Sequence, residues 1–125
     1  MTTSFIQHVG QIGIPVEDIA RATKFYKETL QLPLLFQTDT MAFFQLNDLR
    51  LMLALPEKEE FAHPSSVLYF NVDSIQDVFE QLKDVVSFVG TPHLVTKIGQ
   101  IETWMVFFKD TEDNTHAFMS EVTVS

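Results

Sequence analysis

The sequence contains no cysteine, and this absence excludes several kinds of chemistry at once. A chain without thiols has no disulfide framework, no thiolate nucleophile and no zinc site built from cysteine. Any catalysis would have to use histidine, carboxylates, tyrosine or a bound metal. Glycine is also scarce, with 4 residues in 125, so a glycine-rich phosphate loop is not expected.

The sequence also has few basic residues and lacks long apolar runs. Only 8 Lys and Arg residues stand against 17 Asp and Glu, which gives a formal net charge of −9. This charge disfavours nucleic-acid binding and accommodates a cationic or neutral ligand more easily, although solubility alone also explains it. No run of 18 uncharged apolar residues occurs, and residues 1–4 lack the basic start of a signal peptide. We therefore expect a soluble, cytoplasmic protein with no membrane partner.

What the sequence does contain is one pattern that occurs twice. Residues 12–18 form a short apolar segment that leads into an amphipathic stretch at 19–30, and residues 67–73 lead in the same way into 74–83. Asp18 can cap the first helix, and Ser74 with Asp77 has the spacing of a capping box at the second. A repeat at a spacing of roughly 55 residues indicates a duplicated structural unit.

Strand-like segments follow each predicted helix. They are residues 34–37, 41–46 and 49–55 in the first copy, and 86–89, a possible strand at 94–97, 103–108 and 115–122 in the second. The charged, proline-bounded stretch 56–64 is the predicted loop between the copies.

The order of these elements predicts an α+β fold made of two βαβββ units. The units cover about residues 5–56 and 65–123 of a single domain, residues 1–125. Each unit would form a curved mixed sheet with its helix on one face. The opposite faces would then be free to enclose a cleft.

Two segments resemble a known family. The first runs from Val16 through the helix to the residues Leu30-Gln31-Leu32-Pro33, and the second is the turn at 107–114 before the last strand. Both are similar to segments of the vicinal oxygen chelate superfamily, which includes glyoxalase I, extradiol dioxygenases and the fosfomycin- and bleomycin-resistance proteins. Gln31 and Asp113 stand where the family usually has glycine. If these positions need a positive φ, Gln31 carries a cost of about 1 kcal/mol and Asp113 is more comfortable.

The resemblance implies a divalent metal held by four residues, one near the start and one near the end of each unit. The corresponding positions here are Gln11, Met52, Val67 and Ala117. Glutamine is a first ligand in some glyoxalase I proteins, but a thioether and two hydrocarbon side chains do not complete a ligand set for such a cation. We therefore predict that the inherited metal site is dismantled and that no cofactor is bound, with a divalent metal as the alternative.

Alternation along the strands predicts the wall of the same cavity. If Gln11 points inward, the following residues do so too: Gly13, Arg50, Met52, Ala54, Tyr69, Asn71 and Met119. Such a lining is apolar with a few polar groups, which suits a small organic ligand. The alternative is that Met52, Val67 and Met119 are ordinary core residues and that Tyr69 is a core aromatic.

His93, Glu102 and Trp104 form a second candidate group because they lie close in sequence. A histidine with a carboxylate can transfer protons or bind a displaced metal, although loop residues of these types are also commonly solvated. Trp104 lies in the penultimate strand, and its side cannot be fixed relative to Gln11. His116 has the opposite parity to the cavity wall and is expected to be structural. His63 has no partner that spacing identifies.

Two functional hypotheses follow, with a third kept open. The first is a metal-free small-molecule binding protein similar to the bleomycin-resistance proteins, which hold a ligand in a cleft of paired units and are usually homodimers. Its predicted ligand-binding residues are Gln11, Met52, Tyr69, His93, Glu102, Trp104 and Met119. The second is a metal-dependent lyase, isomerase or dioxygenase that uses Gln11 with relocated ligands such as His93 and Glu102. The third is an interaction protein whose cleft is filled by its own side chains. The sequence names neither the ligand nor any catalytic residue.

Overall fold

The computed structural model describes residues 5–56, 59 and 62–124. The chain divides into two compact units, Met1–Pro64 and Ser65–Ser125. Of the predicted loop 56–64, residues 57, 58, 60 and 61 lie outside the described residues, as do residues 1–4 and 125. Each unit is described by itself below.

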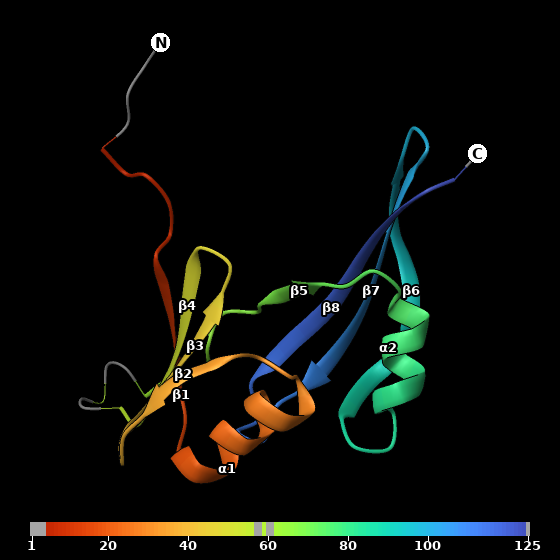
Figure 1. Ribbon diagram of the computed structural model, residues 1–125. Helices are drawn as coiled ribbons and strands as arrows, with labels where there is room; N and C mark the ends of the chain where they lie inside the picture. Colours follow the sequence, from red (N-terminus) through yellow and green to blue (C-terminus); the bar gives the residue numbers. More distant parts are fainter. Residues whose placement is uncertain (1–4, 57–58, 60–61, 125) are drawn as a thin grey trace. The chain divides into compact units, whose positions relative to one another are not determined.

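The first unit is a four-stranded mixed sheet with one helical segment (Figure 1). Its elements are β1 (Gln11–Pro15), α1 (Ile19–Lys24), a π-helical turn η1 (Phe25–Thr29), β2 (Leu34–Gln37), β3 (Met41–Leu46) and β4 (Leu49–Ala54). The strand order is β1-β4-β3-β2, with β1 parallel to β4 and the other neighbours antiparallel.

The second unit repeats this arrangement (Figure 1). Its elements are β5 (Tyr69–Asn71), α2 (Ile75–Leu82), β6 (Ser87–Ile98), β7 (Ile101–Lys109) and β8 (Thr115–Thr123). The strand order is β5-β8-β7-β6, and the first strand is again parallel to the last. The predicted α+β class and the two βαβββ units with matching strand orders are therefore confirmed. None of the helices among the described residues is long and apolar enough to span a membrane.

Both helices begin where the sequence places their caps. The Asp18 carboxylate accepts a hydrogen bond from the backbone N–H of Arg21 at 3.0 Å, and the Ser74 hydroxyl accepts one from Asp77 at 3.3 Å. The first helix departs from the regular α-helix expected over 19–30, because it widens into a π turn after Lys24. Leu30 donates its N–H to the carbonyl of Phe25, five residues back, at 3.0 Å.

Two residues that replace glycine adopt the left-handed backbone conformation. Gln31 has a φ of 60° and Asp113 a φ of 64°. Both positions therefore need the positive φ that glycine adopts easily. The backbone strain falls mainly on Gln31, since aspartate tolerates this region better.

In each unit the helix packs against one face of the sheet. In the first, the fully buried Tyr26 ring lies 6.1 Å from the ring of Phe44, which pairs with the buried Leu51 across β3 and β4. In the second, the rings of Phe79 on α2 and Phe88 on β6 are 4.8 Å apart. We call the opposite side of each sheet its open face.

Strand β6 corrects one predicted boundary. The sequence indicates two segments, 86–89 and a possible strand at 94–97, but the structure has a single strand whose pairing with β7 shifts between Val89 and His93 and again between Leu94 and Thr96. Gly90, with a φ of 85°, and Pro92 lie at the first irregularity. A strand at the sheet edge accommodates both residues, because one of its sides needs no ladder hydrogen bonds.

Candidate functional site

The open face of the first unit contains those predicted cavity residues that belong to this unit. Gln11 pairs with Arg50 and Gly13 pairs with Met52 across the parallel β1–β4 ladder, so all four share this face. The alternating burial of β4 supports the assignment, since Leu51 and Leu53 are fully buried on the helix side. The Gln11 amide donates to the Met52 sulfur at 3.6 Å.

A hollow of about 520 Å³ lies over one end of this face. Its walls are predominantly apolar, with polar atoms from Thr40 and His63. The residues that line it are Gly13, Ile14, Pro15, Thr40, Met41, Met52, Ala54, Leu55, Pro56 and His63. The volume falls within the range of small-molecule pockets, and an apolar lining with few polar groups is typical of them.

Aromatic rings and one cation continue the same face beside the hollow. The rings of Phe36 and Phe43 are stacked with centroids 4.6 Å apart. The guanidinium carbon of Arg50 lies 5.9 Å from the centroid of the Phe43 ring, in the geometry of a cation–π contact. Since Met52 pairs with Phe43 across β3 and β4, these rings adjoin the floor of the hollow.

The open face of the second unit brings together three of the predicted residues. Tyr69 pairs with Ala117, and Met119 pairs with Met105, the residue that also pairs with His93. Tyr69, Met119 and His93 therefore share one face. The Phe107 ring lies between two of them, 6.3 Å from the Tyr69 ring and 6.3 Å from the His93 ring.

Glu102 and Trp104 lie on the other face of that sheet, the one that carries α2. Trp104 pairs with Leu94 and Ser120, so it alternates with Met105 along β7. Its indole N–H donates to the Glu102 carboxylate at 3.1 Å. Both side chains line a separate hollow of about 390 Å³ beside the start of α2, together with Asp73, Ser74, Ile75, Gln76, Ser120 and Val122. The structure thus does not group Glu102 and Trp104 with His93.

The chemistry of the four inherited positions does not fit a divalent metal. Gln11 and Met52 are in contact in the first unit, and the Ala117 N–H donates to the carbonyl of Leu68, next to Val67, in the second. The set offers one neutral amide and one thioether, whereas such metals need several oxygen or imidazole donors. His93 and Glu102 do not replace them, because side chains on opposite faces of one sheet cannot hold the same ion.

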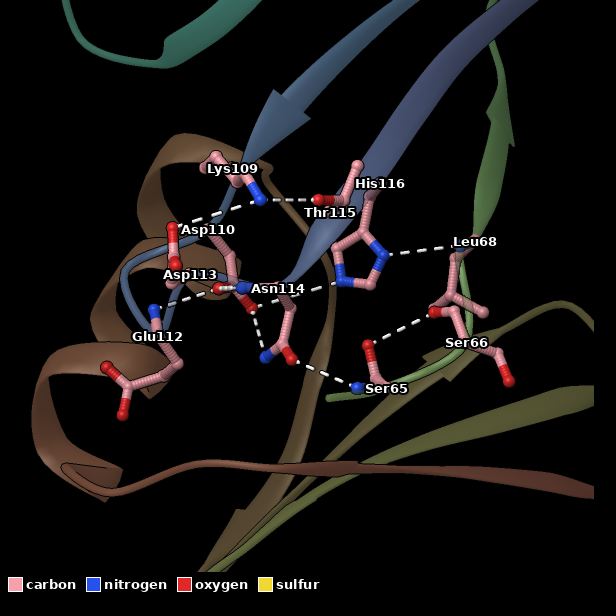
Figure 2. Close-up of polar contacts among 10 residues, drawn as sticks. All are labelled: Ser65, Ser66, Leu68, Lys109, Asp110, Glu112, Asp113, Asn114, Thr115 and His116. Atoms are coloured by element: carbon pink, nitrogen blue, oxygen red, sulfur yellow. Dashed lines mark hydrogen bonds and ion pairs between the residues drawn. The ribbon is translucent and has the colours of Figure 1, made fainter. Parts of the chain in front are cut away.

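Figure 2 shows a buried polar network around the turn between β7 and β8. The Asp110 carboxylate accepts hydrogen bonds from the backbone N–H groups of Glu112 and Asn114, both at 2.8 Å, and from the Asn114 side-chain amide at 3.0 Å. The Asn114 oxygen accepts from the backbone N–H of Ser65 at 3.1 Å. The network thus ties the turn to the segment that leads into β5.

His116 completes the network from β8. It is fully buried, its Nδ1 accepts the N–H of Leu68 at 3.2 Å, and its Nε2 lies 3.9 Å from the Asp110 carboxylate (Figure 2). Burial lowers the pKa of His116 below 6.5, and the Asp110 charge opposes this only in part. The neutral imidazole is structural, on the helix side of the sheet as expected.

His63 and Thr40 are lining residues that the sequence did not single out. Thr40 precedes Met41, which pairs with Ala54, and this pairing brings Thr40 to the rim of the hollow. Its position could be known only from the register of β3 on β4. His63 lies in a segment without periodicity. No local sequence pattern indicated that the His63 side chain lines the hollow.

Comparison with known proteins gives a consistent family. The model of the Glyoxalase/Bleomycin resistance protein/Dioxygenase superfamily matches residues 6–118. No curated protein matches the sequence.

Solved structures of the same fold include the antibiotic binding protein TnmS3 from Streptomyces sp. CB03234, with 20% identity, a TM-score of 0.75 and coverage of 96% of this chain and 100% of that one. A superfamily member from Sphaerobacter thermophilus has 18% identity and a TM-score of 0.77, with coverages of 94% and 99%. A lactoylglutathione lyase from Agrobacterium tumefaciens has 13% identity and a TM-score of 0.70, with coverages of 92% and 94%. The matched residues and the duplicated fold place this chain in the Glyoxalase/Bleomycin resistance protein/Dioxygenase superfamily.

Proposed function

We propose that the protein binds a small organic molecule in the hollow of the first unit and does so without a metal at the inherited position. The observation that carries this proposal is the lining of the hollow. Met52, at one of the inherited ligand positions, contributes a thioether to an apolar floor instead of a metal-binding oxygen or imidazole. The space supports binding of a ligand by shape and apolar contact.

The superfamily is compatible with this role. One structural neighbour, TnmS3, is described as an antibiotic binding protein, and another is a lactoylglutathione lyase. Fold alone does not choose between binding and catalysis. The donor set at Gln11, Met52, Val67 and Ala117 favours binding over the metal-dependent alternative. A homodimer and a cytoplasmic location stay predictions, and sedimentation equilibrium of the full chain checks the dimer.

The test is a calorimetric titration of the full chain with small aromatic probes, namely 2-naphthamide, 2-naphthoate and 2-naphthylmethylammonium. We expect saturable binding of at least one probe. Met52→Glu places a carboxylate in the apolar floor and should weaken binding about tenfold or more, equivalent to about 1.4 kcal/mol per factor of ten. Gln37→Glu is the matched control, because it adds the same charge at an exposed position outside the hollow.

Metal content is measured in parallel on protein purified without chelator. About one equivalent of Zn, Ni, Mn or Fe per chain, lost in Gln11→Ala, would replace the proposal with the metal-dependent alternative. Equal loss of probe binding in Met52→Glu and Gln37→Glu would place the binding site elsewhere. No saturable binding of any probe would leave the interaction-protein hypothesis.

A further inference from the structure

Among the described residues, the cation Arg50 projects from the open face of the first unit next to the lining of the hollow, without being one of the lining residues. Arg50 lies two residues before Met52 on β4, so both side chains project from the open face at a spacing of about 7 Å along the strand. We propose that the ligand of this hollow carries an anionic group, such as a carboxylate, on an apolar planar body, and that Arg50 binds the anion. This inference rests on the proposed function.

The surroundings of Arg50 orient its guanidinium group beside an apolar surface. The guanidinium lies 5.9 Å from the Phe43 ring centroid, and Phe43 is itself stacked on Phe36. An arginine that packs against an aromatic ring can keep N–H donors free for a carboxylate. Gln11, opposite Arg50 on β1, adds an amide that donates to the Met52 thioether, which is a weak acceptor.

The charge of Arg50 is not balanced locally. Within the described part of the chain, no carboxylate lies within ion-pair distance of its guanidinium, although acidic residues outnumber basic ones by 17 to 8. An exposed, unpaired guanidinium next to an apolar hollow is suited to a carboxylate supplied by a ligand, which it can bind with two parallel hydrogen bonds.

This local feature refines the expectation drawn from net charge. A charge of −9 favours cationic or neutral ligands at long range, but salt screens exposed charges beyond about 8–10 Å. Contact specificity is decided by the groups that touch the ligand. On the open face of the first unit, the charged group next to the hollow is the Arg50 guanidinium, which a ligand that extends past Met52 would meet.

The test uses three probes of one shape in the full chain: 2-naphthoate, 2-naphthamide and 2-naphthylmethylammonium. We expect 2-naphthoate to bind about tenfold more tightly than the amide, with the ammonium weakest, and the advantage to shrink as salt is raised. Arg50→Met keeps an unbranched apolar stem and removes the charge. It should reduce 2-naphthoate affinity to that of the amide while amide affinity changes less than about threefold.

Two further variants keep the inference falsifiable. Lys27→Met, an exposed position in η1, removes the same charge from the helical side of the unit and should leave the preference for 2-naphthoate intact. Arg50→Lys retains the charge but not the planar pair of N–H donors that binds a carboxylate, and should keep part of the preference for 2-naphthoate.

The outcomes separate this inference from the proposed function. If the amide binds as tightly as 2-naphthoate, or if Arg50→Met leaves the preference unchanged, the hollow binds ligands but Arg50 does not select anions. If Lys27→Met abolishes the preference equally, long-range charge and not Arg50 is responsible. If Arg50→Met weakens all three probes equally, the residue only shapes the face. If no probe binds, both proposals are wrong.

Discussion

The buried network around Asp110 makes a sharp prediction about stability. Asp110→Asn preserves the shape of the side chain but converts one acceptor into an amide donor. If the new oxygen takes the two backbone N–H groups that Asp110 accepts at 2.8 Å, the new amide nitrogen faces the Asn114 side-chain nitrogen. Turning the Asn114 amide removes that clash but presents its nitrogen to the N–H of Ser65. Every arrangement therefore leaves two donors facing each other.

The expected cost follows from the burial of these groups. Asp110 and Asn114 are 7% and 4% exposed, so water cannot satisfy the unpaired donor. Loss of one charge-assisted hydrogen bond with a buried donor left unsatisfied costs about 2–3 kcal/mol. Equilibrium unfolding in urea measures this, with the slope of the transition monitored to confirm that the same surface is exposed.

Two companion variants test the reasoning. Asp113→Asn removes the same charge from the same turn, but the Asp113 side chain is 90% exposed and its ion pair with Lys109 is long, at 3.9 Å. The free energy of unfolding should therefore change by less than about 0.5 kcal/mol. The double exchange Asp110→Asn with Asn114→Asp restores a donor–acceptor match at the hydrogen bonds with Glu112, residue 114 and Ser65, and should recover much of the loss, although the contact with His116 Nε2 is not restored. If the exchange recovers nothing, or if Asp113→Asn costs as much as Asp110→Asn, the donor–acceptor argument is refuted.

Two further predictions concern stability. Gln31→Gly should raise the unfolding free energy by about 1 kcal/mol, because glycine adopts the left-handed backbone at a φ of 60° without strain. Gln31→Ala keeps the strain and should be nearly neutral. Urea titration compares the two variants, and equal effects would show that the strain is not in the backbone. Because burial lowers the pKa of His116 and its Nδ1 already accepts the Leu68 N–H, the unfolded state binds a proton more readily than the folded state. The contribution of His116 to stability should be complete well above pH 6.5 and decline as pH falls through that value, with a slope of at most about 1.4 kcal/mol per pH unit. Unfolding curves across this range should lose that slope in His116→Gln, and an unchanged slope would assign it to another group.

The fold was predictable because its signals are local and repeated. The caps at Asp18 and Ser74 mark the helix starts directly, and the strand segments between them follow in the same order twice. The positive φ at Gln31 and Asp113 was expected only through family resemblance, since neither residue type demands it. The π turn after Lys24 could not be predicted, because five residues of altered winding barely change the pattern of apolar positions.

The site was predictable only where strand parity is set by short, regular strands. On β4 the alternation of Arg50 and Met52 with buried leucines assigns the open face without further information. On β6 the pairing with β7 is irregular: four steps from Val89 to His93 match two on β7 and keep the face, whereas two steps from Leu94 to Thr96 match one and reverse it. The side of Trp104 depends in turn on the register of β7 against β8, which no local pattern encodes.

The parallel pairing of the first and last strand within each unit has a consequence for how the protein forms. Gly13 pairs with Met52 and Phe70 pairs with Phe118, so among the described strands the one that begins each unit has its sheet neighbour about forty to fifty positions further along the chain. The antiparallel neighbours β3 and β4, or β7 and β8, can pair early by closing short loops, but β1 and β5 must wait for a long one. We therefore expect the first strand of each unit to be the last to join its sheet, so that Gln11 on β1 and Tyr69 on β5 reach their places late in folding.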